Sequence, residues 1–362
     1  MPTGKFITAS VLRATTLVFA IIVWSFFASA CAGDETERMG SRFNAYLNRL
    51  PDLKPLPADQ EYVLLVDYIE DAKLPTLQGD GLARMFRLTE KYTQQYLGYR
   101  VRFKLSRRIA IEPFFREKKP DFRHPVLSYP TRAWYMDPGD PRLDEKLLKV
   151  VGHALKDKSP ALLARYFGKR KGTLTDYHRR IVTEFRRKLN GIHGEQDSSG
   201  RPLLNPRTDT VRKHYLSFAH WDSIAYQEKK ADFLITNTII AGPDTGMPIY
   251  VINRGGVTSA FVENSAHRPL GGVGVMGLYP FLSNGPFFTG ERGTMSLAES
   301  LDAIALLLVH ELGHLLMRKK EAYDLEGSIH VAPRGLDYRA WVKGIKAAGD
   351  SKSALVPTLK KY

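Results

Sequence analysis

The chain has 362 residues, of which 43% are hydrophobic and 25% are charged; this is enough to bury a substantial core and excludes a disordered tail or a fibre. The formal net charge is +15, but the basic clusters lack the interleaved aromatic residues of a nucleic-acid-binding surface, so we expect no specific nucleic-acid partner. With a single cysteine, no disulfide forms within the chain.

The N-terminus is typical of a signal peptide spanning residues 1–30. Lys5 and Arg13 precede an apolar run over residues 14–28, and small residues then lead to Cys31. The run is shorter than the roughly 20 apolar residues of a membrane span, which favours export over anchoring by a helix. The segment also resembles the lipobox of bacterial lipoproteins, which implies a lipid on Cys31 and attachment to a membrane of the cell envelope. The alternative is a soluble secretory signal that leaves Cys31 as a free thiol.

Residues 31–60 are polar and contain three prolines, so we interpret them as a tether to a folded domain over residues 61–362. Residues 62–69 form a short apolar run that predicts a strand. Residues 81–97 have apolar residues at helical spacing, closed by Gly98, and residues 99–105 alternate as a strand does. A strand, a helix and a strand within about fifty residues predict a crossover unit in a partly parallel sheet.

In the middle of the chain, the residue pattern predicts a basic helical insertion over about residues 140–230 and then an interior strand over residues 231–240. Residues 272–277 match the G-x-G-x-x-G pattern, but we expect extended chain after them, which argues against a dinucleotide site. We interpret residues 271–282 as an edge strand whose free backbone can pair with an extended peptide. Together these elements predict an α+β fold with an α/β N-terminal half.

A five-residue motif suggests metal chemistry. Ser296 and Glu299 have capping-box spacing and open an apolar helix that contains His310, Glu311 and His314. Positions four apart share a helix face, so the two histidines can bind one ion. Glu311 points about 100° away around the axis, where it can take a proton from a water on the ion without binding the ion. The pattern predicts Zn²⁺ as cofactor and Glu311 as general base.

The segment His310-Glu311-Leu312-Gly313-His314 resembles the zincin metallopeptidase motif, with metzincins as the most similar branch. The resemblance implies hydrolysis of peptide bonds by a domain with a mixed sheet. In that domain the zinc helix comes after a strand, a helix, two further strands and an antiparallel edge strand that lines the cleft. The segments near residues 61, 82, 100, 231 and 271 follow this order, with the helical insertion between the second and third strands.

The chain departs from metzincins after the second histidine, because Met317 stands where they have a glycine and Lys320 where they have the third zinc ligand. Three residues are candidates for that ligand. We favour His330 by residue type, with Glu321 and Asp324 as alternatives. Glu321 can bind only if the helix ends before it.

Ser328-Ile329-His330 resembles the metzincin Met-turn, which gives His330 a second possible role, packing beneath the metal. Tyr323 and Tyr338 are candidate hydrogen-bond donors to a tetrahedral oxyanion. The sequence thus predicts an exported, lipid-anchored zinc metallopeptidase that acts on a peptide or protein. The alternative is a non-catalytic binding lipoprotein of the cell envelope on a zincin scaffold.

Overall fold

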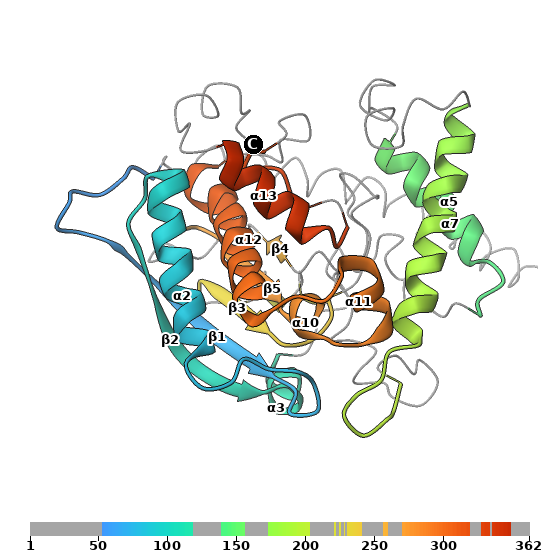
Figure 1. Cartoon of the computed structure of the whole chain (residues 1–362), viewed down its shortest axis with the longest axis horizontal. Helices are drawn as coiled ribbons and strands as arrows, with labels where there is room; N and C mark the ends of the chain where they lie inside the picture. The colour runs from blue at the N-terminus through green and yellow to red at the C-terminus, as the bar shows by residue number, and fades with distance from the viewer. Residues whose placement is uncertain are drawn as a thin grey trace, which may run out of the picture.

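The computed structural model describes residues 53–118, 139–155, 173–202, 221, 224–225, 228, 230–240, 256–259, 270–318, 327–333 and 335–348. Within these ranges the fold combines a five-stranded sheet with helices (Figure 1). The expected signal peptide, Cys31 and most of the expected tether lie outside the described residues.

The sheet has the strand order β2-β1-β3-β5-β4. The strands are β1 (Tyr62–Glu70), β2 (Val101–Ala110), β3 (Phe233–Thr236), β4 (Gly256–Ser259) and β5 (Val273–Gly277). β1 pairs in parallel with β2 and with β3, and β3 pairs in parallel with β5, whereas β4 is antiparallel to β5. The predicted mixture of helices and strands with a partly parallel sheet is therefore confirmed.

The first crossover unit forms as the sequence predicts. β1 leads into helix α2 (Gly81–Tyr92), which continues as the π-helical turn η1 (Thr93–Leu97) and ends at Gly98 with φ 78°. This left-handed C-cap suits glycine, which has no Cβ to clash. β2 then returns parallel to β1, and Phe86 of α2 stacks on Phe103 of β2 with ring centroids 5.3 Å apart.

The glycine-rich segment differs from the prediction. Residues 273–277 form β5, a parallel strand inside the sheet, and the antiparallel edge strand is β4, earlier in the chain. Gly274 explains the error: the ring of Phe233 on β3 lies where a Cβ at position 274 would be, 2.2 Å from its Cε1. The glycines thus allow close packing between interior strands. Residues 279–282 form a short helix, α10, instead of extended chain.

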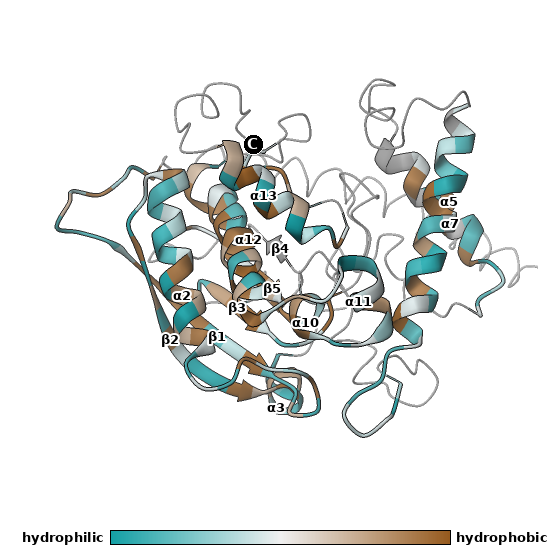
Figure 2. Cartoon of the chain, viewed as in Figure 1, coloured by the Kyte–Doolittle hydropathy of each residue, from teal (hydrophilic) through white to brown (hydrophobic). Residues whose placement is uncertain are grey.

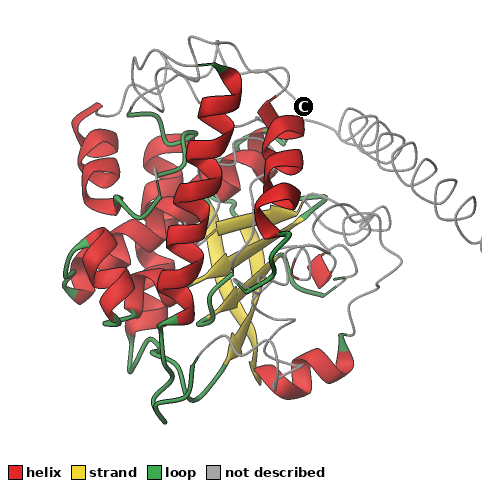
Figure 3. Cartoon of the chain, turned by 90° about the vertical axis from the view of Figure 1, so that its right-hand side faces the viewer, coloured by secondary structure: helices red, strands yellow, loops and turns green. Residues whose placement is uncertain are grey.

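Helices α2 and α12 (Leu297–Met317) pack against each other and against the sheet, with α13 (Tyr338–Ala348) beside α12 (Figures 1 and 3). Among the described residues, α12 is the helix long and apolar enough to cross a membrane, but 89% of its most apolar window is buried inside the fold. Figure 2 shows the hydrophobic character of this helix along most of its length. It is the central core helix.

The remaining described helices are short or belong to the expected insertion. They are α3 (Ile111–Glu117), α5 (Leu143–Leu155), α7 (Leu174–His193), α10 (Tyr279–Leu282) and α11 (Pro286–Arg292). α5 and α7 pack together, joined in part by an ion pair of 2.5 Å between Arg186 and Asp144. Arg187 reaches Glu291 on α11 at 2.6 Å. Part of the basic surface expected for this region is therefore paired with carboxylates.

Candidate metal centre

Helix α12 begins at the predicted capping box. The Ser296 hydroxyl accepts from the Glu299 backbone N–H at 3.2 Å, and the Glu299 carboxylate accepts from the Ser296 N–H at 2.8 Å. Hydrogen bonds from Arg339 and Ser296 lower the pKa of Glu299 to about 2. Every residue from Ala303 to Leu316 is buried, so the second half of the helix, with the motif, lies in the core.

His310 and His314 lie together as the helical spacing predicts. Their Nε2 atoms are 3.2 Å apart, and both side chains are buried. His310 Nδ1 lies 2.8 Å from the carbonyl oxygen of Ile329. Because a carbonyl only accepts, Nδ1 carries the proton and the unprotonated Nε2 faces His314. A histidine binds a metal through its unprotonated nitrogen.

The spacing of the two nitrogens fits one metal ion. Tetrahedral zinc with Zn–N bonds of 2.0–2.1 Å sets its ligand nitrogens about 3.3 Å apart. The observed separation of 3.2 Å is close to that value. The same separation is a hydrogen-bond distance between the two rings. The pair is therefore compatible with one zinc ion, and a backbone carbonyl orients at least one of its rings.

Glu311 is 2% exposed and follows His310 directly on the helix. It lies about 100° around the axis from His310 and about 60° from His314. On helical periodicity, position 311 is therefore on the flank of the histidine pair and not between the two rings. The role of Glu311 beside a metal stays a prediction.

His330 lies against the helix backbone at Gly313. A Cβ at position 313 would be 2.6 Å from His330 Cε1 and 2.8 Å from its Nδ1. Around the axis, position 313 is about 60° from His310 and about 160° from Glu311. The ring of His330 therefore lies on the flank opposite Glu311, and only glycine at 313 leaves room for it.

The turn that carries His330 also contacts the pair directly. The Ser328 hydroxyl accepts from the His330 backbone N–H at 3.1 Å, and the intervening Ile329 supplies the carbonyl that binds His310. The indole N–H of Trp341 on α13 donates to the next carbonyl, that of Val331, at 2.6 Å. α13 thus helps to hold the turn against the motif.

Within the described part of the chain, no group of three or more His, Cys, Asp or Glu side chains is arranged to hold a metal. His310 and His314 come together, and His330 is at Gly313. Glu321 and Asp324 lie in residues 319–326, outside the described residues. Glu321 can bind the metal only if the helix ends before it. The helix ends at Met317, four positions earlier, so this requirement is met.

The expectation for Tyr338 is wrong. Its fully buried ring stacks on Phe281 with centroids 4.2 Å apart, and the Phe281 carbonyl accepts from the Ser300 hydroxyl. Ser300 precedes His310 by ten residues, or about 15 Å along the helix. Tyr338 therefore belongs to the core at the other end of α12. Tyr323 lies outside the described residues.

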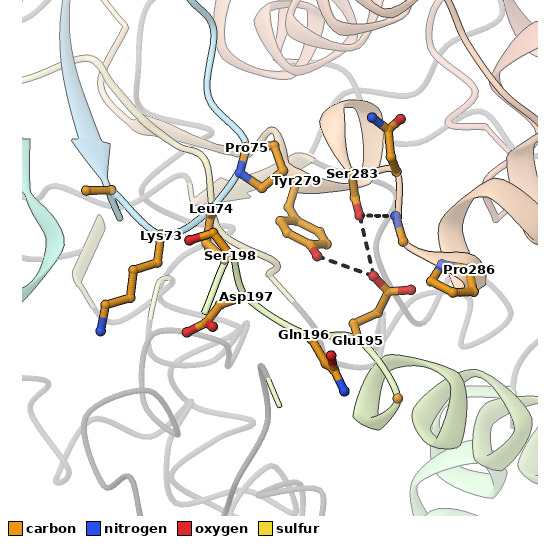
Figure 4. Close-up of a pocket in the computed structure, with 14 residues that line it drawn as sticks. Lys73, Leu74, Pro75, Glu195, Gln196, Asp197, Ser198, Tyr279, Ser283 and Pro286 are labelled. Carbon is orange, nitrogen blue, oxygen red and sulfur yellow. Dashed lines mark hydrogen bonds between the residues drawn. The ribbon is translucent and has the colours of Figure 1, made fainter. Parts of the chain in front are cut away.

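A pocket of about 620 Å³ lies at the carboxyl ends of β1 and β5 (Figure 4). Glu195 closes it from the inside, accepting from the Phe287 N–H at 2.9 Å and, more weakly, from the hydroxyls of Tyr279 and Ser283. Burial, and to a lesser extent Glu195, raise the pKa of Tyr279. The lining residues are Ala72–Pro75, Gly194–Ser198, Tyr279 and Ser283–Pro286.

This pocket is separate from the histidine pair. The chain leaves α12 at Arg318, which contacts Leu270 just before β5, so the pair is towards the amino end of β5. The carboxylates of Glu195 and Asp197 are buried and bonded to neighbouring groups of the fold. We therefore treat the histidine pair, and not this pocket, as the candidate metal centre.

Three residues that contact the site were not predicted from the sequence: Gly313, Ile329 and Arg318. Gly313 did carry a signal, since a glycine in a buried helix is costly unless another group approaches closely. Ile329 acts through its backbone carbonyl, which every residue type has, so the sequence gives no signal for this role.

No protein-family model, curated protein or solved structure matches the chain.

Proposed function

We propose that the protein is a zinc-dependent metallopeptidase that acts on peptide or protein substrates. The observation that carries the proposal is the separation of 3.2 Å between the Nε2 atoms of His310 and His314, with the buried Glu311 beside them on the same helix. Two imidazoles and a flanking carboxylate are the groups that zinc hydrolysis needs.

Bound zinc would act as a Lewis acid and lower the pKa of water to around 7. His310 and His314 would hold the ion through Nε2, and the Ile329 carbonyl keeps the His310 ring in the required tautomer. Glu311 takes the proton from the attacking water. It then delivers this proton to the amide nitrogen of the leaving segment, which departs as an amine.

The third ligand comes from one of the residues that follow the helix. The packing of His330 against Gly313 supports a role beneath the metal, as in the Met-turn that Ser328-Ile329-His330 resembles. The end of the helix at Met317 supports a carboxylate ligand from Glu321 or Asp324. We therefore favour one of the two carboxylates, and His330 is now the alternative.

The sheet supports a docking position for a peptide. β4 is an edge strand antiparallel to β5, and α12 packs against both strands. The metzincin resemblance implies an antiparallel edge strand of this kind beside the zinc helix. Within the described part of the sheet, β5 is the strand that pairs with β4. We propose that an extended substrate pairs with the opposite edge of β4, where main-chain hydrogen bonds bind it with little dependence on its sequence.

We further propose that the enzyme works outside the cytoplasm, at the cell envelope. The support is the signal-peptide pattern and the lipobox-like segment before Cys31. A lipid on Cys31 would hold the catalytic domain at a membrane through the polar segment up to residue 60.

Glu311→Gln is the test of the base. It keeps the shape of the side chain but cannot take a proton, so we expect cleavage of a broad peptide library to fall at least 100-fold. Zinc content should stay within twofold of wild type. Glu299→Gln, the same change in the first turn of the same helix, should leave cleavage per folded molecule unchanged. Undiminished cleavage by Glu311→Gln would refute the assignment.

Metal analysis separates the proposal from its alternative. We expect the purified mature chain to hold close to one equivalent of zinc after reconstitution, and His310→Ala to hold less than a tenth. A wild-type chain below a tenth of an equivalent would contradict the peptidase. It would favour the non-catalytic binding lipoprotein instead.

A further inference from the structure

Arg318, the residue that ends the metal helix, has an unusual backbone. Its φ of 55° and ψ of 33° are left-handed, and it is the one non-glycine residue with positive φ in the described ranges. Side chains with a Cβ disfavour this conformation. All the other positive-φ positions described in the chain are glycines. A specific interaction is therefore needed to keep an arginine here.

The buried guanidinium of Arg318 supplies that interaction. Its Nη1 donates to the carbonyls of Leu315 and Leu270. The Leu315 carbonyl is among the last four of the helix, which have no partner within it. Leu270 lies just before β5. One side chain thus caps the last turn of α12 and ties that turn to the start of an interior strand.

We call the hydrogen bonds from Arg318 to the carbonyls of Leu315 and Leu270 the clamp. The clamp stabilises the helical turn that contains His314. Helix ends fray, and the last turn is the first part of a helix to open. His310 lies one turn deeper and is held by Ile329. His314 is adjacent to Leu315, so a loosened last turn would move its Nε2 away from that of His310.

We infer that Arg318 is a positioning residue for the metal, holding His314 in place through the carbonyls of Leu315 and Leu270. The inference rests on the proposed zinc site. It explains why arginine is present where glycine would adopt the same backbone without strain: glycine can end the helix but cannot clamp it.

Two substitutions separate the backbone from the clamp. Arg318→Gly keeps the left-handed turn and removes the guanidinium, whereas Arg318→Lys keeps one cationic donor. We expect the zinc dissociation constant, measured by chelator competition, to rise at least tenfold for Arg318→Gly and by an intermediate factor for Arg318→Lys. In the metal-free protein, amide exchange at residues 315–317 should accelerate at least tenfold in Arg318→Gly, with residues 306–310 unchanged.

Arg292 provides a matched control. It is also a buried arginine that donates to backbone carbonyls, those of Pro280, Ser283 and Gly293, before the start of α12. Arg292→Lys should lower the unfolding temperature but leave the zinc dissociation constant within twofold of wild type. A similar weakening of zinc binding by Arg292→Lys would show that general loss of stability, and not position, is responsible.

The outcomes distinguish the inference from the proposal beneath it. If wild type binds zinc and Arg318→Gly binds it equally well, the inference is wrong and the metal site stands. If wild type binds no zinc, the proposed function fails, and exchange at residues 315–317 still tests the clamp. If neither Arg318 variant folds, exchange in wild type decides: strong protection of those amides supports the clamp and fast exchange overturns it.

Discussion

The ring of His330 occupies the space that a side chain at Gly313 would fill, with Cε1 only 2.6 Å from the position of a Cβ. This contact joins the turn that follows helix α12 to the middle of the motif. It also explains why the helix contains a glycine between the glutamate and the second histidine. The conformation of the motif thus depends on a neighbour seventeen positions later in the chain as well as on its own helical spacing.

Gly313→Ala should therefore destabilise the protein, against the usual preference of helices for alanine. Alanine is favoured over glycine by about 1 kcal/mol in a helix, but forcing a methyl into a packed contact costs about 1–3 kcal/mol. We expect a net loss of about 1 kcal/mol in urea unfolding and weaker zinc binding, because the shifted turn moves Ile329 away from His310.

Gly344→Ala on α13 is the control for this prediction. Among the described residues, a Cβ at position 344 would meet only the Cα of Gly327, at 3.9 Å, which is an ordinary contact. We expect this variant to be as stable as wild type or more stable, by up to about 1 kcal/mol. If Gly313→Ala raised the free energy of unfolding by the same amount, the close contact with His330 would not affect stability, and the prediction would be wrong.

His330→Met tests the role of the turn. Methionine fills space against a helix but is a weak ligand for zinc beside two imidazoles. If His330 packs beneath the metal, as its position at Gly313 favours, the variant should keep its zinc affinity within tenfold of wild type. A loss of zinc of 100-fold or more would instead make His330 the third ligand. Glu321→Gln and Asp324→Asn, measured in parallel, should then both retain zinc.

The capping box makes stability depend on pH. Hydrogen bonds from Arg339 and Ser296 lower the pKa of Glu299 from 4.5 to about 2. The contribution of the ionised carboxylate is complete above pH 4.5 and is lost as the pH falls towards 2. The unfolding temperature of Glu299→Gln should thus lie below that of wild type at pH 7, and the gap should narrow steadily below pH 4.5. A gap independent of pH would exclude the ionised form as the cause.

The ion pair between Asp67 and Arg107 connects β1 to β2, and its carboxylate is fully buried. The hydrogen bond with Asp67 raises the pKa of Arg107. Arg107→Met would leave a buried charge without this partner, which we expect to cost about 2–4 kcal/mol in urea unfolding. Arg108→Met, which breaks the more exposed pair with Glu70, should cost less than about 1 kcal/mol. Equal losses would contradict this ranking.

Local sequence signals predicted a substantial part of this structure. The apolar run at residues 62–69 corresponds to β1, the helical spacing closed by Gly98 corresponds to α2 with η1, and the alternation from residue 99 corresponds to β2. The prediction of an edge strand over residues 271–282 was wrong because an apolar, glycine-rich sequence does not indicate which strands lie beside it. Only the pairing of β5 with β3 and β4 shows that it is interior.

For the candidate site, the sequence alone determined the pair His310 and His314 and the flanking Glu311, because helical periodicity depends only on neighbours along the chain. The tertiary structure decided that Ile329 orients His310, that His330 lies at Gly313 and that Arg318 reaches Leu270. These contacts join segments that are far apart along the chain. They consist of hydrogen bonds to backbone carbonyls and of close packing of a ring against a glycine. Residue types and spacing do not encode such contacts.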